Sequence, residues 1–157
     1  MQSSRRPKID PVGSPGPAAS DKCEVRRPAP ARSGIVAAMS IKGLHIPHGA
    51  GQLATVTVNE RNAMSYYPYV QGGPVEAGHL SISGLDLAVY VNSRYLNLDD
   101  SMVNLRASAL FEMAGAGMAG GAIRGDALVV LAAGDRDYER SLPADVLAAF
   151  LATDESE

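Results

Sequence analysis

Few residues of this 157-residue chain have both the type and the spacing needed for chemistry. His45 and His48 are three positions apart, and together with His79 they would supply the nitrogen ligands of a zinc site. Pro47, however, disfavours a helix that would carry the first two histidines on one face, and no cysteine follows Cys23. We therefore predict isolated, solvated histidines, no metal site and an unpaired thiol at Cys23.

The acidic and hydroxyl side chains do not form a recognisable catalytic set either. Asp99 and Asp100 would suit a general acid and base, but adjacent carboxylates before a helix more often interact with its positive N-terminal end. Ser108 and Ser141 lie far in sequence from any histidine, and no Gly-x-Ser-x-Gly turn is present. The sequence therefore predicts no catalytic residue and favours a protein that is not an enzyme.

Gly115, Gly117 and Gly120 have the spacing of the dinucleotide-binding fingerprint. In that fold the glycines follow a strand and open a helix, whose N-terminus holds the pyrophosphate. Here the glycine-rich residues 114–121 follow an expected helix and precede an expected strand. We interpret them as a flexible connection and predict no cofactor.

Tyrosines supply the best candidates for a binding surface, because a tyrosine brings a large contact area with little rotamer entropy. Three of them lie in residues 63–70, which can hold at most one or two helical turns because Pro68 interrupts a helix. In so small a core, some tyrosines must be buried instead. The candidate binding residues are Tyr66, Tyr67, Tyr69, Tyr90 and Arg106.

The charges divide the chain into two parts. The formal net charge of −3 excludes a globally basic nucleic-acid binder. Residues 1–38 carry seven basic and three acidic residues and six of the ten prolines, whereas residues 39–157 carry seven basic and fourteen acidic residues. The first segment has too few apolar side chains to offset the entropy of ordering it. We predict a disordered tail over residues 1–38 and a single domain over residues 39–157.

Three interpretations of this tail compete. A targeting signal is disfavoured because no apolar segment follows Arg5 and Arg6. A basic arm would contact phosphates or another anionic surface. We favour the third interpretation, in which Met39 is the true start, because Arg, Pro, Ala and Gly are what GC-rich codons supply without selection for structure.

Alternating apolar and polar residues predict three strands early in the domain. Residues 53–58 have the period of two and the β-branched content of a strand. Residues 75–82 and 85–91 are separated only by Ser83 and Gly84, which indicates a tight β-hairpin. One face of the second hairpin strand is apolar, so we expect the opposite face to meet water. That opposite face consists of Asp86, Ala88, Tyr90 and Asn92.

Two helices and one buried strand are expected in the second half. Residues 105–113 predict a helix that ends at Gly115, and residues 127–132 form an unbroken apolar run typical of a central strand. A last helix begins near Pro143. The expected buried face of the first helix is Leu105, Ala109, Leu110 and Met113. The expected stripe of the last helix is Val146, Leu147, Phe150 and Leu151.

These elements predict an α+β fold, with an antiparallel sheet of about four strands and two or three helices. The expected core residues are apolar and lie on the inward faces of these elements. They are Val56, Val58, Leu85, Leu87, Val89, Val91, Leu110, Leu128, Val130, Val146, Leu147 and Phe150.

Three segments in order resemble a domain of unknown function found in small proteins of bacteriophages, plasmids and Gram-positive bacteria. Residues 87–92 resemble its hairpin ending in Tyr-Val-Asn, residues 104–110 its Asn-x-Arg-Ala-Thr-x-Leu helix, and residues 123–130 its Ile-x-Gly-Asp strand. The chain departs from the pattern at Ser108, where threonine is usual, and in the glycine-rich residues 114–121.

The resemblance implies a phage or mobile-element origin and no particular activity. It also implies structural roles for Asn104 and Arg106, one capping the helix and the other pairing with Asp126.

Together these observations predict a small accessory or host-modulating protein that binds a macromolecule in the cytoplasm of a bacterial host. The expected partner is a host or phage protein, because an acidic domain suits a basic protein surface and not nucleic acid, and no apolar run is long enough to cross a membrane. The alternative is an enzyme that handles a small molecule or nucleotide on the polar face of the sheet. The oligomeric state stays open.

Overall fold

The computed structural model describes residues 40–117 and 121–154. The chain divides into two units, residues 1–35 and 36–157, and every described residue belongs to the second. The predicted tail over residues 1–38 therefore lies outside the described residues.

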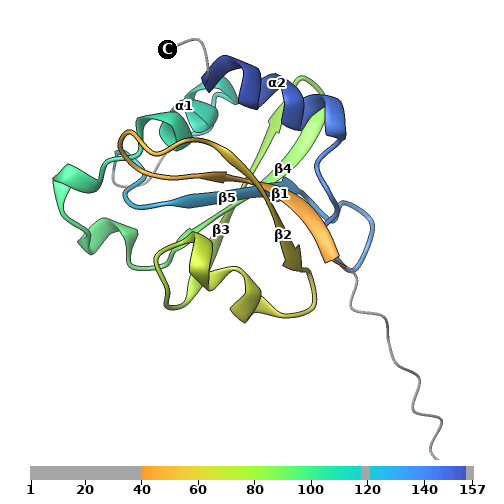
Figure 1. The fold of residues 1–157 in the computed structure, drawn as a ribbon, viewed down its shortest axis with the longest axis horizontal. Coiled ribbons are helices and arrows are strands. Elements are labelled where there is room, and N and C mark those ends of the chain that lie inside the picture. The colour runs from red at the N-terminus through yellow and green to blue at the C-terminus, as the bar shows by residue number, and fades with distance from the viewer. Residues whose placement is uncertain (1–39, 118–120, 155–157) are drawn as a thin grey trace, which may run out of the picture. The chain divides into compact units, whose positions relative to one another are not determined.

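A five-stranded antiparallel sheet forms the centre of the described unit (Figure 1). Its strands in chain order are β1 (Ser40–Ile46), β2 (Ala54–Asn59), β3 (Val75–Ile82), β4 (Leu85–Asn92) and β5 (Ala127–Leu131). Their order in the sheet is β2-β1-β5-β4-β3. The helices are α1 (Leu105–Met113) and α2 (Ala144–Asp154), with short 3₁₀ helices in the connections. The predicted α+β fold is confirmed, with one strand more than expected.

The additional strand is β1, which lies between β2 and β5. Its sequence does not alternate cleanly, because Gly43 and His45 stand where apolar residues would mark the second face. Gly43 is required there, since a Cβ at this position would lie 2.8 Å from the carbonyl oxygen of Val129 on β5.

The β3–β4 hairpin has the predicted strands and the predicted turn. Ser83 and Gly84 both have positive φ, at 51° and 79°. This conformation gives the type I′ geometry that suits the twist of two paired strands.

The two helices cover one face of the sheet, as Figure 1 shows. On this face, Leu44, Val89 and Val129 are fully buried and belong to one core cluster with Leu110 of α1 and Leu147 of α2. Phe150 and Leu151 also pack against this cluster, as the predicted stripe of the last helix requires. Most predicted core residues are buried, and the half-buried ones are Val56, Leu85, Val146 and Phe150.

The opposite face of the sheet is covered by the connection between β2 and β3. This connection contains two 3₁₀ helices, η1 (Ala63–Ser65) and η2 (Tyr67–Tyr69), which are the one or two turns expected there. Tyr66 and Val70 pack with Ala88, Leu128 and Val130 in a second core cluster. The expectation that this face meets water is therefore wrong at Ala88, which is fully buried.

Helix α1 has the predicted bounds, but three of the four residues of its predicted buried face are exposed. Leu105 is 75% exposed and Met113 70% exposed, and Ala109 is exposed as well. Leu110 is buried as predicted, and the other buried residues of the helix are Ala107 and Ser108. Six of the nine helix residues are apolar, so periodicity alone could not choose the face that packs on the sheet.

No helix in the described part of the chain is both long enough and apolar enough to cross a membrane.

Candidate functional site

The residue that caps helix α1, Asn104, also binds the backbone at the end of the sheet. Asn104 is 1% exposed, and its side-chain oxygen accepts a hydrogen bond from the backbone N–H of Ala107 at 3.0 Å, which caps the helix. Its amide nitrogen donates to the carbonyls of Ile46 at 2.9 Å and Gly125 at 3.0 Å. One side chain thus joins the start of α1 to the end of β1 and to the segment before β5.

Arg106 organises the loop between β1 and β2. Its Nη2 donates to three backbone carbonyls of this loop, those of Pro47 at 2.8 Å, Gly49 at 3.1 Å and Gly51 at 2.5 Å. The resemblance implied that one of Asn104 and Arg106 caps the helix and that the other pairs with Asp126. The Asp126 carboxylate pairs with two histidines, and the capping role is filled by Asn104.

The two histidines near the end of β1 converge on Asp126. The His48 backbone N–H donates to Oδ1 of Asp126 at 2.9 Å, and His48 Nδ1 lies 2.6 Å from the same oxygen. His45 Nε2 lies 3.4 Å from Oδ2. The prediction of isolated, solvated histidines is therefore wrong for His45 and His48, because folding brings Asp126 next to them across separations of 81 and 78 positions. His79, the third histidine, is exposed.

This cluster changes the titration of Asp126. Burial raises the pKa of the Asp126 carboxyl, but hydrogen bonds from the His48 side chain and backbone and the charges of His45 and His48 outweigh burial, so the pKa is lowered overall. The carboxylate therefore stays ionised and keeps holding the loop.

Gln71 extends the cluster from the other side. Its backbone has a positive φ of 62°, which is uncommon for a residue with a side chain, and its Nε2 lies 3.0 Å from His48 Nδ1. Gly125, at φ 81°, packs so closely that a Cβ there would lie 2.7 Å from Gln71 Oε1.

A carboxylate beside an imidazole can orient a general base. Here the Asp126 carboxylate also holds the loop in place, because it accepts a hydrogen bond from the His48 backbone.

Among residues 40–117 and 121–154, no group of three or more His, Cys, Asp or Glu side chains is arranged to hold a metal ion.

A cleft of about 770 Å³ lies between this ordered loop and the start of α1. Residues 49–52 line one side, and residues 103–106 with Ala109 line the other. Arg106, a predicted binding residue, is therefore part of the cleft wall. Leu105 and Ala109 continue from the cleft onto the outer face of α1, where Met113 follows one turn later. We call Leu105, Ala109 and Met113 the α1 stripe.

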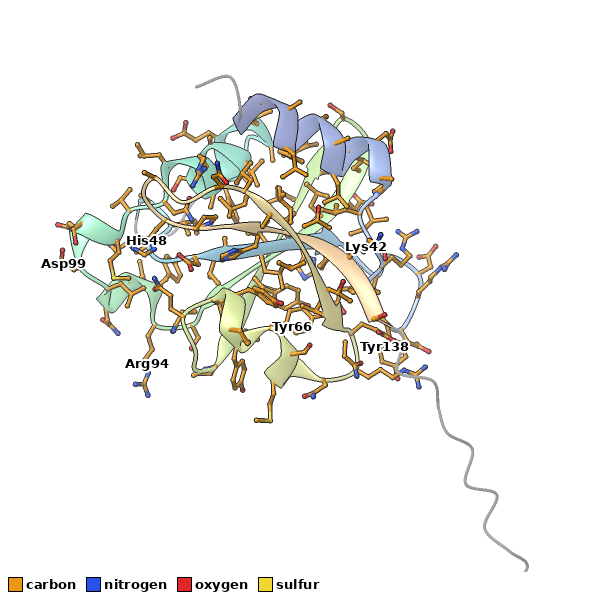
Figure 2. The ribbon with its side chains drawn as sticks, viewed as in Figure 1. Lys42, His48, Tyr66, Arg94, Asp99 and Tyr138 are labelled. Atoms are coloured by element: carbon orange, nitrogen blue, oxygen red, sulfur yellow. The ribbon has the colours of Figure 1, made fainter. Side chains whose placement is uncertain are left out.

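The predicted tyrosines do not gather on one exposed surface. Figure 2 shows Tyr66 on the side of the sheet away from the helices, and this residue is 3% exposed. Its ring centroid lies 4.7 Å from that of Tyr90, which is half-buried. Tyr67 and Tyr69 are half-buried, and the Tyr69 ring contacts His45. The role of Tyr66 in an exposed contact surface is therefore excluded, because its ring is part of the second core cluster.

Comparisons of the chain with protein-family models, with curated proteins and with solved structures find no match. The resemblance to a family of unknown function stays a prediction.

The Asp126 cluster leads to a pH prediction. Because the folded-state pKa of Asp126 is lowered, its contribution to stability is present above its unfolded pKa, about 4, and is lost as the pH falls through the folded value. Asp126→Asn should therefore lower the free energy of unfolding by about 1 to 3 kcal/mol at pH 7. The difference from wild type should shrink in urea titrations as the pH falls below about 4. A difference that stays constant between neutral and acid pH would contradict this assignment.

Proposed function

We propose that this protein is a non-enzymatic accessory module, of the kind carried by phages and mobile elements, that binds another protein in the cytoplasm of a bacterial host. It does so by placing the α1 stripe in an apolar groove of the partner. The observation that carries this proposal is the outward orientation of the stripe.

The exposure of the stripe is unusual for a helix that packs on a sheet. Leu105 and Met113 are the two most exposed large apolar side chains of the described residues. They stand at positions i and i+8 with Ala109 at i+4 between them, so each residue of the row lies one helical turn from the next on the same side of α1. A water-facing row of this kind does not help α1 to fold, because that helix already packs through Leu110 and Ala107.

The charge near the stripe indicates the chemistry of the partner. Glu112 is exposed, and it lies on the face of α1 that carries Leu105 and Ala109, being seven and three positions from them. Residues 39–157 as a whole carry twice as many acidic as basic residues. The groove on the partner is therefore expected to be rimmed by Lys or Arg, which would also speed association at low salt.

The cleft beside the stripe supports the same function. Arg106 and Asp126 hold the β1–β2 loop in place, so the cleft wall is formed before any partner arrives. A preformed surface loses less entropy on binding than a mobile one. The partner can therefore enclose Leu105 while inserting a side chain of its own into the cleft.

The test places a photo-crosslinking amino acid at position 105, 113 or 64 of the full chain in the bacterium that carries the gene. Met64 is the matched control, because it is an apolar side chain of similar exposure (68%) in η1. We expect positions 105 and 113, but not 64, to form an adduct with one protein whose groove is apolar and basic-rimmed. Leu105→Glu should then weaken binding of that purified protein on the order of 100-fold, and Met64→Glu should leave it within about twofold.

Two results would overturn this function. Adducts of the same protein at all three positions would remove the α1 stripe as the site. Adducts between two copies of the chain, together with a dimer in sedimentation that Leu105→Glu dissociates, would show that the stripe is a self-association surface.

A further inference from the structure

A second group of polar side chains, two of them buried and two half-buried, lies on the side of the sheet away from the helices. It consists of Glu60, Tyr66, Tyr90 and Glu139, which we call the Tyr–Glu cluster. Glu60 follows β2, Tyr66 joins η1 to η2, Tyr90 belongs to β4, and Glu139 lies in the loop after β5. Three parts of the chain, namely the β2–β3 connection, β4 and the loop after β5, thus contribute polar side chains to a region distinct from the α1 stripe.

Two members of the cluster are buried and have no hydrogen-bond partner. The Glu60 side chain is 1% exposed, and neither of its carboxylate oxygens is hydrogen-bonded. Tyr66 is 3% exposed, and its hydroxyl is unpartnered too. Buried polar groups in native proteins are almost always satisfied, so an unsatisfied pair at one place indicates water or an ion between them.

The electrostatics favour a cation over water. The Tyr90 hydroxyl donates a hydrogen bond to Glu139. The Tyr90 ring centroid lies 4.7 Å from that of Tyr66, so Glu139 lies on the same side of the sheet as the Tyr66 ring. Burial raises the pKa of the Tyr66 phenol, and the negative charges of Glu139 and Glu60 raise it further. Water would satisfy the hydrogen bonds of the two carboxylates but would leave their charge uncompensated in a poorly hydrated site.

The neighbouring arginine compensates this charge only in part. Arg61 Nε lies 3.6 Å from Glu60 Oε1, beyond hydrogen-bond distance. The Arg61 side chain is 40% exposed, and its guanidinium carbon lies 4.6 Å from the centroid of the Tyr138 ring. Arg61 and Tyr138 are the sequence neighbours of Glu60 and Glu139, so this exposed contact lies beside the cluster. Figure 2 shows Tyr138 at the end of the sheet opposite His48.

We propose that the Tyr–Glu cluster binds one hard divalent cation of the Ca²⁺ type. The carboxylates of Glu60 and Glu139 supply its negative ligands, and the neutral hydroxyl oxygen of Tyr66 supplies a further one. Hard cations prefer oxygen ligands of this kind, and two carboxylates balance a divalent charge. The ion would satisfy the unpartnered oxygens of Glu60 and Tyr66 at once.

Terbium luminescence tests this site directly. Tb³⁺ has the ligand preference of Ca²⁺, and the chain has six tyrosines and no tryptophan, so emission excited through tyrosine reports an ion beside a phenol. We expect the full chain to give saturable emission at one ion per chain, which Ca²⁺ displaces. Glu60→Gln should weaken Tb³⁺ binding on the order of 100-fold, because it removes a charged ligand.

Matched variants separate the cluster from the acidic surface. Glu76→Gln removes an exposed carboxylate on β3 and should leave Tb³⁺ binding within about twofold. Addition of Ca²⁺ should raise the thermal midpoint of wild type and of Glu76→Gln but not of Glu60→Gln.

If Glu60→Gln does not fold, Glu139→Gln and Tyr66→Phe should each weaken Tb³⁺ binding at least tenfold. Absence of emission in wild type, or emission unchanged in the cluster variants, would overturn the proposal and leave buried water as the occupant.

Discussion

Asn104→Ala is expected to lower the free energy of unfolding by about 3 to 7 kcal/mol, although the change removes only a small polar side chain. Loss of the helix cap accounts for about 1 kcal/mol. The rest arises because the carbonyls of Ile46 and Gly125 lose a donor in a buried place, at about 1 to 3 kcal/mol for each unsatisfied group. Urea denaturation of wild type and variant measures the difference.

Two controls separate the cap from the buried donor. Asn62→Ala removes a cap of the same residue type from η1, where the side chain is exposed, and should lower stability by less than about 1 kcal/mol. Asn104→Asp keeps the capping oxygen but loses the amide donor, so it should be nearly as damaging as Asn104→Ala. A nearly neutral Asn104→Asp would show that the cap alone matters and that the link to the sheet does not.

The segments that carry the family resemblance contact one another in the fold. Asn104 binds the carbonyl of Gly125, and the hydroxyl of Ser108 accepts a hydrogen bond from the backbone N–H of Ile123 at 2.9 Å. A threonine at position 108, as in the family pattern, has a hydroxyl that can accept the same hydrogen bond. Residues of this motif therefore have a sufficient explanation in the joint between α1 and the sheet, without any catalytic role.

Local sequence signals predicted the elements that local interactions define. The β3–β4 hairpin follows from Ser83 and Gly84 in its turn, and the end of α1 follows from Gly115, with φ 65°. The sequence offers Asp99, Asp100, Ser101 and Asn104 as N-caps of α1, and the structure selects Asn104. Each of these signals acts within a few residues. None depends on what lies across the sheet.

The features that sequence analysis missed all depend on distant contacts. β1 was not predicted because Gly43 interrupts its pattern, and the reason for that glycine is the backbone of β5, far along the chain. The His48–Asp126 contact joins residues 78 positions apart. Three residues of the predicted buried face of α1 are exposed, because six of the nine helix residues are apolar and only contacts with the distant sheet decide which of them are buried.

The corrected rotation of α1 gives the second large prediction. Leu110→Ala should lower the free energy of unfolding by about 2 to 5 kcal/mol, because Leu110 is 4% exposed and its removal leaves a cavity under the helix. Leu105→Ala makes the same chemical change on the same helix, but Leu105 is 75% exposed, so the loss should stay below about 0.5 kcal/mol. Leucine and alanine have similar helix propensities, so the difference between the two variants reflects burial and not helix propensity.

The same pair distinguishes stability from binding. Denaturation midpoints in urea measure the first property, and affinity for the crosslinked partner measures the second. Leu105→Ala should weaken binding of the partner while leaving the urea midpoint nearly unchanged, because a water-facing side chain contributes to the complex and not to the core. Equal destabilisation by the two substitutions would mean that Leu105 is buried in solution. The α1 stripe would then have to be abandoned as a contact surface.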